Sequence, residues 1–276
     1  MKKILVVEDD RTTRHLLSRV LKKAGFSVAT APDGAQGLRR LRSETFHLVL
    51  LDIWMPRMNG LELLAHLRNQ RTRPKAVVMT SDNTPETVLR AIREQAYHYI
   101  TKPLDPKAVI ALVTEALAAS PVPPIEVISA RPDWVELLVP CEMSAADRLQ
   151  SFLARLDADL PADLRDSVGQ VFHEMLVNAI EWGGKLDPNR KVRIAYVRAR
   201  RMVLYRIADP GTGFQVEDLT HAAVSYAPDQ LLNHLGHRQK KGLRPGGFGI
   251  LMARAMADEL IYNERHNEVL FVKYLG

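Results

Sequence analysis

The chain has 276 residues, 46% of them hydrophobic and 25% charged, which is the size and composition of about two globular domains. A single cysteine excludes an intrachain disulfide and agrees with a cytoplasmic location. No apolar run is long enough to predict a membrane span. A secretion signal is not predicted either, because acids at residues 8–10 interrupt the N-terminal apolar run. The net charge of +6 arises from basic side chains scattered through residues 1–120, a pattern that argues against a nucleic-acid site.

Residues 1–118 alternate between strand and helix patterns. The predicted strands cover residues 3–8, 26–31, 47–52, 75–81 and 97–102. The predicted helices cover residues 11–25, 34–43, 60–70 and 85–96, and a last helix starts at Asp105 and Pro106. Strands apolar enough to be buried on both faces, each followed by a helix, predict an α/β domain with a doubly wound, five-stranded parallel sheet of flavodoxin-like type. Ligands of such sheets bind beyond the carboxyl ends of the strands.

Residues 119–124 are rich in proline and predict a linker, after which residues 125–276 follow a second pattern. One strand (134–140) precedes a helix capped by Ser144 and a longer helix over 161–183. Two antiparallel strands (191–200 and 202–209), an irregular stretch of about 30 residues the size of a lid, a helix from Gly246 and two closing strands follow. Helices on one face of a mostly antiparallel sheet predict an α+β two-layer sandwich.

Five polar side chains follow or end strands of the first domain. Glu8 and Asp9 end the first strand, Asp52 the third and Thr80 the fourth, and Lys102 follows the fifth. Parallel strands bring these residues to the same side of the sheet. Three carboxylates held together would repel one another unless they bind a cation, and oxygen ligands favour Mg²⁺. One carboxylate could then attack a phosphoryl group, while Lys102 and Thr80 stabilise the new charge.

These residues stand in segments (VVEDD, LLDIWMPRMNG, VVMTS and YITKP) that resemble the receiver domain of two-component response regulators over nearly all of residues 1–118. The resemblance implies that Asp52 accepts a phosphoryl group from an upstream sensor histidine kinase, with Lys102 as the phosphoryl partner. The Mg²⁺ ligands that it implies are Asp9, Asp52 and the backbone carbonyl of Trp54, with Glu8 acting through water. The switch pair that it implies is Thr80 and Tyr99.

A second candidate site lies in residues 125–276 and lacks a Walker-type phosphate loop. Asp209 ends a strand and could accept a hydrogen bond from an amino group such as that of adenine. The residues without a Cβ, which would let backbone approach a ring or a phosphate, are Gly211, Gly213, Gly246, Gly247 and Gly249. Glu174 and Asn178 lie four residues apart on one helix face, where Asn178 could bind Mg²⁺ and Glu174 could act as a general base.

The order of these pieces resembles the ATPase fold shared by gyrase B, histidine kinases and anti-sigma-factor serine kinases. The matching segments are the N box from Glu174 to Asn178, the first glycine box from Asp209 to Gly213 and the second glycine box from Gly246 to Gly249. The resemblance implies that ATP and Mg²⁺ bind here. This chain departs from the family pattern at Trp182, where a histidine is common, at Pro245 before the second glycine box, and in a last strand that lacks a threonine.

His173 directly precedes Glu174, and a His-Glu pair on a helix is typical of the phosphorylated histidine of sensor kinases. Such kinases need a two-helix dimerisation segment before the ATPase domain. Between Pro124 and the N box there is room for only one strand and two helices, the second of which carries the N box itself. His173 is therefore predicted to carry no phosphate, and the layout resembles the anti-sigma-factor serine kinases.

The sequence therefore predicts a response regulator whose output domain binds ATP and phosphorylates or sequesters an antagonist protein or a sigma factor. Two alternatives stay open. The second domain could be a non-catalytic, ATP-binding protein-interaction module, or the chain could be a transcription factor or scaffold that reads nucleic acid, although no recognition motif supports the latter. Homodimer formation also stays open.

Overall fold

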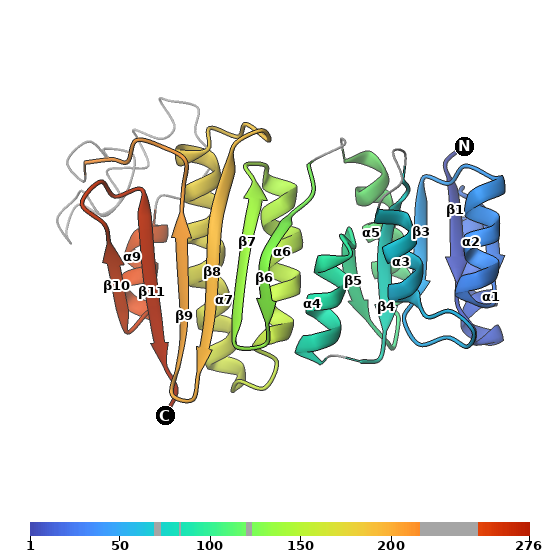
Figure 1. Cartoon of the computed structure of the whole chain (residues 1–276), viewed down its shortest axis with the longest axis horizontal. Helices are drawn as coiled ribbons and strands as arrows, with labels where there is room; N and C mark the ends of the chain where they lie inside the picture. The colour runs from blue at the N-terminus through green and yellow to red at the C-terminus, as the bar shows by residue number, and fades with distance from the viewer. Residues whose placement is uncertain (69–72, 83, 120–122, 216–247) are drawn as a thin grey trace. The chain divides into compact units, whose positions relative to one another are not determined.

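The computed structural model describes residues 1–68, 73–82, 84–119, 123–215 and 248–276 (Figure 1). The chain divides into two compact units, Met1–Pro121 and Val122–Gly276. The predicted fold class is confirmed, with a parallel five-stranded sheet in the first unit and an antiparallel six-stranded sheet with helices in the second. Within the described ranges, no helix combines the length and the apolar character that crossing a membrane requires.

The first unit is a parallel sheet with the strand order β2-β1-β3-β4-β5. Its strands are β1 (Lys3–Val7), β2 (Ser27–Ala31), β3 (Leu48–Asp52), β4 (Lys75–Thr80) and β5 (His98–Thr101). Its helices are α1 (Arg11–Lys23), α2 (Gly34–Ser43), α3 (Gly60–Arg68), α4 (Pro85–Arg93) and α5 (Pro106–Ala118). The order changes direction between β1 and β3, which is the place where ligands bind in doubly wound sheets.

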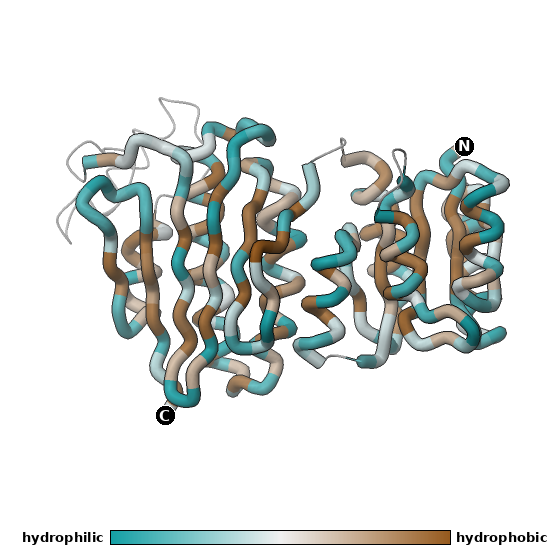
Figure 2. Tube along the Cα trace, in the orientation of Figure 1, coloured by the Kyte–Doolittle hydropathy of each residue, from teal (hydrophilic) through white to brown (hydrophobic). Residues whose placement is uncertain are grey.

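The apolar strands of this sheet are buried on both faces, as their composition predicts. On one face, Leu17 of α1 and Val113 of α5 pack with Ile4, Leu48 and Val77 of the central strands. Figure 2 shows hydrophobic residues concentrated along these strands. The rigid core thus fixes the carboxyl ends of β1, β3, β4 and β5 relative to one another.

The second unit is an antiparallel sheet with the strand order β10-β11-β9-β8-β7-β6, and its helices lie on one face (Figure 1). Its strands are β6 (Glu126–Arg131), β7 (Trp134–Pro140), β8 (Lys191–Ala199), β9 (Met202–Ala208), β10 (Glu259–Tyr262) and β11 (Glu268–Tyr274). Its helices are α6 (Met143–Leu156), α7 (Ala162–Asn178), the π-helix η1 (Ala179–Gly183) and α9 (Gly249–Met256). Burial alternates along β8 and β9, so one face of the sheet packs against the helices.

An aromatic group fills the space between this sheet and its helices. The Tyr205 ring lies 4.9 Å from the Phe172 ring, 5.0 Å from the Tyr196 ring and 5.0 Å from the Phe271 ring, measured between centroids. Both tyrosine hydroxyls donate to the buried carboxylate of Asp157, at 2.9 Å each. A buried hydroxyl needs a partner, so Asp157 allows two tyrosines to occupy the core.

Three local expectations are corrected by the structure. Two strands, not one, precede α6, because residues 126–131 pair with β7 through a turn at Pro132 and Asp133. Glu142 stands at the N-cap position of α6 without a side-chain capping hydrogen bond, and Ser144 lies inside the first turn. The predicted long helix changes after Asn178 into the π-helix η1, a form often found at functional sites.

Candidate functional sites

The acidic pocket of the first unit forms where β1 and β3 end. Glu8, Asp9 and Asp52 each offer a carboxylate oxygen, and these atoms lie within 4.8 Å of one another. Glu8 and Asp52 are buried, whereas Asp9 is exposed. Glu8 and Asp52 share the ammonium group of Lys102, and Asp9 adds a third carboxylate, so an oxygen-ligated divalent cation fits this donor set.

Lys102 reaches this pocket from the end of β5. Its Nζ donates to Glu8 Oε1 at 2.9 Å and to Asp52 Oδ2 at 2.8 Å. Burial raises the pKa of Glu8 to about 7, although the hydrogen bond from Lys102 lowers it. Burial also lowers the pKa of Lys102, but its bonds to Asp52 and Glu8 raise that pKa above the ordinary value overall. The ammonium group is therefore charged at neutral pH and lies beside the oxygen that would receive a phosphoryl group.

The loop after β3 is held against the backbone of Asp52. Gly60 N donates to Ile53 O at 2.8 Å, and a Cβ at Gly60 would lie closer than 3.0 Å to the carbonyl oxygen of Asp52, so only glycine fits. Arg57 forms an ion pair with the buried Asp33, and although burial raises the pKa of Asp33, the bond from Arg57 helps to lower it to about 2. These contacts fix the loop that begins with Ile53 and includes the exposed Trp54.

Thr80 and Tyr99, the predicted switch pair, both hold the backbone of one residue in the loop after β4. Thr80 Oγ1 accepts a hydrogen bond from Asp82 N at 3.1 Å, and the Tyr99 hydroxyl donates to Asp82 O. Both side chains are buried, at 0% and 1% exposure. Movement of the Thr80 hydroxyl toward a phosphoryl group on Asp52 would therefore break a bond to the loop that Tyr99 also holds.

In the second unit, the N box meets the start of α9. A Cβ at Gly249 would lie 2.5 Å from Glu174 Oε2 and 3.5 Å from Asn178 Nδ2, so this glycine lets α9 begin directly against both side chains. The first and last predicted segments of the ATP site, about 70 residues apart in sequence, are thereby brought together. The structure places Gly249 as the point of contact, whereas Gly246 and Gly247 lie outside the described residues.

The first glycine box packs against the π-helix that follows the N box. Gly211 N donates to Asp209 Oδ1 at 2.7 Å. A Cβ at Gly183 would lie closer than 3.0 Å to the Asp209 carboxylate, so the π-helix lies directly against it. Burial raises the pKa of Asp209, against the lowering effects of the Gly211 hydrogen bond and the charge of Arg190. The first glycine box thus places a partly buried carboxylate beside backbone without a Cβ, a combination that suits an amino group on a flat ring.

The two glycines of this box serve packing within the protein, which the sequence reasoning did not foresee. Gly213 has a φ of +88°, and a Cβ there would lie closer than 3.0 Å to the carbonyl oxygen of Arg265. Asn267 Nδ2 donates to Gly211 O at 3.1 Å, and Asn267 O accepts from Asp209 N at 2.9 Å. Asn267 and Gly183 are the functional neighbours that sequence reasoning missed. No local pattern marks either of them, because both act on residues far away in the sequence.

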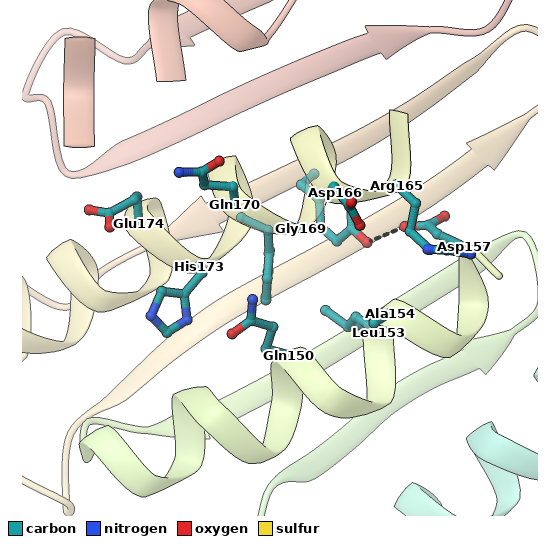
Figure 3. A pocket seen from close by; sticks show the side chains of 12 residues that line it. Gln150, Leu153, Ala154, Asp157, Arg165, Asp166, Gly169, Gln170, His173 and Glu174 are labelled. Atoms are coloured by element: carbon teal, nitrogen blue, oxygen red, sulfur yellow. Dashed lines mark hydrogen bonds between the residues drawn. The ribbon is translucent and has the colours of Figure 1, made fainter. Parts of the chain in front are cut away.

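His173 lies on α7 one residue before Glu174 but does not share its surroundings. Figure 3 shows the His173 ring directed toward Gln150 of α6, whereas Glu174 reaches Gly249 of α9. The Nδ1 atom of His173 is buried and has no hydrogen-bond partner among the described residues. The histidine is therefore part of the layer between α6 and α7.

Two protein families match consecutive parts of the chain. Residues 4–114 match the family described as response regulator receiver domain, and residues 141–273 match the family described as histidine kinase-like ATPase domain. The first match contains the acidic pocket with Asp52 and Lys102. The second contains the N box and the two glycine boxes.

Individual proteins are also similar to this chain. The DNA-binding response regulator MtrA of Mycobacterium tuberculosis (strain ATCC 25618 / H37Rv) is 33% identical over 199 residues, covering 72% of this chain and 86% of MtrA. The DNA-binding transcriptional regulator NtrC of Escherichia coli (strain K12) is 34% identical over 115 residues, covering 42% of this chain and 24% of NtrC. The solved receiver domain of NtrX from Brucella abortus is 34% identical, covers 42% of this chain and 99% of that chain, and has a TM-score of 0.40.

Proposed function

This chain belongs to the response regulators, and from its pairing of a receiver domain with a histidine kinase-like ATPase domain we propose that phosphorylation of Asp52 switches an ATP-binding output that acts on a partner protein. The partner is an antagonist protein or a sigma factor, which the output domain phosphorylates on serine or threonine, or sequesters. The observation that carries the proposal is the contact of Glu174 and Asn178 with Gly249, because it brings together two predicted segments of the nucleotide site that lie about 70 residues apart in sequence.

The receiver step uses the residues of the acidic pocket. A carboxylate oxygen of Asp52 attacks the phosphorus of a phosphohistidine on the upstream kinase, and the histidine nitrogen leaves with its electron pair. Lys102, already 2.8 Å from Asp52 Oδ2, pairs with the charge of the new acyl phosphate. Asp9, Asp52 and the carbonyl of Trp54 would hold Mg²⁺, with Glu8 acting through water, and the ion would neutralise phosphoryl oxygens when bound.

Transmission begins at Thr80. A phosphoryl group on Asp52 attracts the Thr80 hydroxyl, which then gives up its hydrogen bond from Asp82 N. Since Tyr99 holds the carbonyl of the same residue, the loop after β4 and the Tyr99 ring repack together. This is a local charge change that biases a two-state element.

The output step uses the N box and the glycine boxes. Asp209 would accept a hydrogen bond from the adenine amino group, and Asn178 would offer its amide oxygen to Mg²⁺. Glu174 would remove the proton from the hydroxyl that is phosphorylated. Gly211 and Gly213 would let backbone approach the adenine ring, and the glycines of the second box, Gly246, Gly247 and Gly249, would offer backbone N–H groups to the phosphates.

The proposal is tested by ADP formation. The full chain, with and without Asp52 phosphorylation, is incubated with ATP and Mg²⁺, and ADP and phosphoserine or phosphothreonine on co-purifying proteins are measured. Glu174→Ala should leave binding of a non-hydrolysable ATP analogue intact and lower turnover by about 10²- to 10⁴-fold, because a general base acts only in the reaction. If turnover persists in Glu174→Ala, Glu174 is not the general base.

One observation favours a second candidate, a non-catalytic ATP-binding interaction module. Trp182 stands in the π-helix where related kinases commonly have a histidine, and its side chain is 41% exposed. Binding of the ATP analogue without ADP formation in either phosphorylation state would favour this module over the kinase. The name of MtrA refers to DNA, but residues 141–273 of this chain match the ATPase family, which favours an output that acts on a protein.

A further prediction concerns His173, which we expect to remain unphosphorylated. Its ring packs between α6 and α7 rather than standing free on a helix surface (Figure 3). After incubation of the full chain with ATP and Mg²⁺, acid-labile and base-stable phosphate should be absent. Its presence in the wild type and loss in His173→Gln would instead identify a histidine kinase.

Asn178 is expected to matter only when the metal is present. Its side chain borders Gly249 and would contact Mg²⁺ rather than the base. Asn178→Ala should weaken binding of the ATP analogue several-fold with Mg²⁺ and leave it nearly unchanged in EDTA, as measured by calorimetry. Equal losses in both buffers would show that Asn178 contributes to the fold or to the base rather than to the metal.

A further inference from the structure

A groove lies between α6 and α7 and is lined by residues of both helices. Its volume is about 410 Å³. Phe172 of α7 and Tyr205 of β9 are among the buried residues that line it, and the hydroxyl of Tyr205 donates to Asp157 within it. At Gly169 a Cβ would meet nothing within 4 Å, so part of the open space lies where α7 lacks a side chain.

Carboxylates are the most numerous polar groups around this groove, beside the amides of Gln150 and Gln170 and the guanidinium of Arg165. Asp157, Asp166 and Glu174 bring carboxylates, and Gln150 brings an amide oxygen. The buried Nδ1 of His173 has no hydrogen-bond partner within the described part of the chain. A ligand that carries several donors and no acceptor would match this lining.

The charges of the lining also favour a cation. Asp157 is compensated by Arg198, at 3.5 Å, and by two tyrosine hydroxyls. For Asp166 and Glu174, the described residues provide no ion pair. The positive group among the lining residues is Arg165, whose Nη1 points to Ala158 O at 3.5 Å. Arg165 lies four residues, or about 6 Å of helix, before Gly169, but Asp166 and Glu174 together outnumber it, so the lining keeps an excess of negative charge.

We propose that this groove binds the arginine side chain of a partner protein. A guanidinium group carries five N–H donors and no acceptor, and it stays charged at all physiological pH values. The exposed residues Ala154, Asp166 and Gln170 border the groove, so the main chain of a partner can remain in solvent while one side chain enters. Glu174 belongs both to this lining and to the contact with Gly249, which would place the partner next to the N box.

The test uses the full chain with its histidine rings labelled. The probe is the blocked tripeptide acetyl-Ala-Arg-Ala-amide, and the matched control is the same peptide with citrulline, which has nearly the same shape but no charge. The arginine peptide should shift one of the nine histidine ring signals, and that signal should be missing in His173→Gln. The citrulline peptide should bind at least about tenfold more weakly, since charge-assisted hydrogen bonds are lost.

Two pairs of variants locate the site. Gly169→Leu fills the groove and should abolish the shift, whereas Gly169→Ala should retain most of it. Asp166→Asn should weaken binding about fivefold, the value of one exposed ion pair, while Asp163→Asn, one turn earlier on the exposed side of α7, should have no effect. Equal binding of the citrulline peptide, persistence of the shift in Gly169→Leu, or no shift by the arginine peptide would each overturn the inference.

The inference does not depend on nucleotide binding. Calorimetry with the ATP analogue on Gly169→Leu should match the wild type, because a Cβ at Gly169 would meet no atom of the N box or of the first glycine box within 4 Å. The two proposals can therefore fail separately, since binding of the arginine peptide tests the groove and binding of the ATP analogue tests the proposed output.

Discussion

Replacement of Asp52 by asparagine is expected to abolish acyl-phosphate formation on this chain completely. The asparagine amide has the same size but lacks the nucleophilic oxygen, and its nitrogen would face the ammonium group of Lys102, which now donates to Asp52 Oδ2 at 2.8 Å. A small-molecule phosphodonor with Mg²⁺ should label the wild type, and hydroxylamine should remove the label. EDTA should prevent labelling, because the three carboxylates would lose the cation that offsets their repulsion.

Asp10→Asn is a matched control for Asp52→Asn. Asp10 lies just after the pocket acids, but it caps α1 by accepting from Thr13 N at 2.7 Å. Asparagine caps a helix about as well as aspartate, so Asp10→Asn should be labelled like the wild type. Label that survives Asp52→Asn, with or without a change in Asp10→Asn, would place the phosphoacceptor elsewhere.

The second large effect, a loss of affinity for the ATP analogue, is expected on substitution of Asp209. In Asp209→Asn, the side-chain oxygen can still accept from Gly211 N, as Oδ1 does now at 2.7 Å. The amide nitrogen would then face the adenine amino group, and two donors would be left opposed in a partly buried pocket. Such a loss costs about 1–3 kcal/mol, or about 5- to 150-fold in affinity for the ATP analogue by calorimetry.

A geometric variant tests the same pocket without touching the carboxylate itself. In Gly183→Ala the new methyl group would overlap the Asp209 carboxylate and displace it, so nucleotide affinity should fall in the same direction. Gly169→Ala adds a methyl group to open space on α7 and should keep wild-type affinity. If Asp209→Asn and Gly183→Ala both bind like the wild type, the adenine pocket is not beside η1.

The fold could be predicted well because its signals are local. Runs such as 48–52 are buried on both faces, and Asp33 and Asp105 cap helices at the expected places, with side chains that accept from Gln36 N and Lys107 N. The strand β6 escaped prediction because a bulge between Val127 and Ser129 breaks its alternation and leaves Ile128 exposed. The turn at Pro132 and Asp133 was the signal that could have revealed it.

The candidate sites show the same difference between local and long-range signals. The family motifs name the groups that act, such as Asp52 and Asp209, because those residues stand in short segments. They do not name the neighbours that hold these groups, since Asn267 contacts Gly211 across 56 residues of sequence and Tyr205 meets Asp157 across 48. Such partners depend on tertiary packing, and only a structure brings them together.

The strand that the sequence concealed has a consequence for the solution behaviour of this protein. β6 is the terminal strand in the order of its sheet, and terminal strands with free backbone groups invite aggregation with other molecules. Its bulge and its exposed charged ends, Glu126 and Arg131, are features that discourage such pairing. A protease cut after Arg131 would remove this protection from β7 and its exposed Trp134, and the remaining fragment is expected to aggregate.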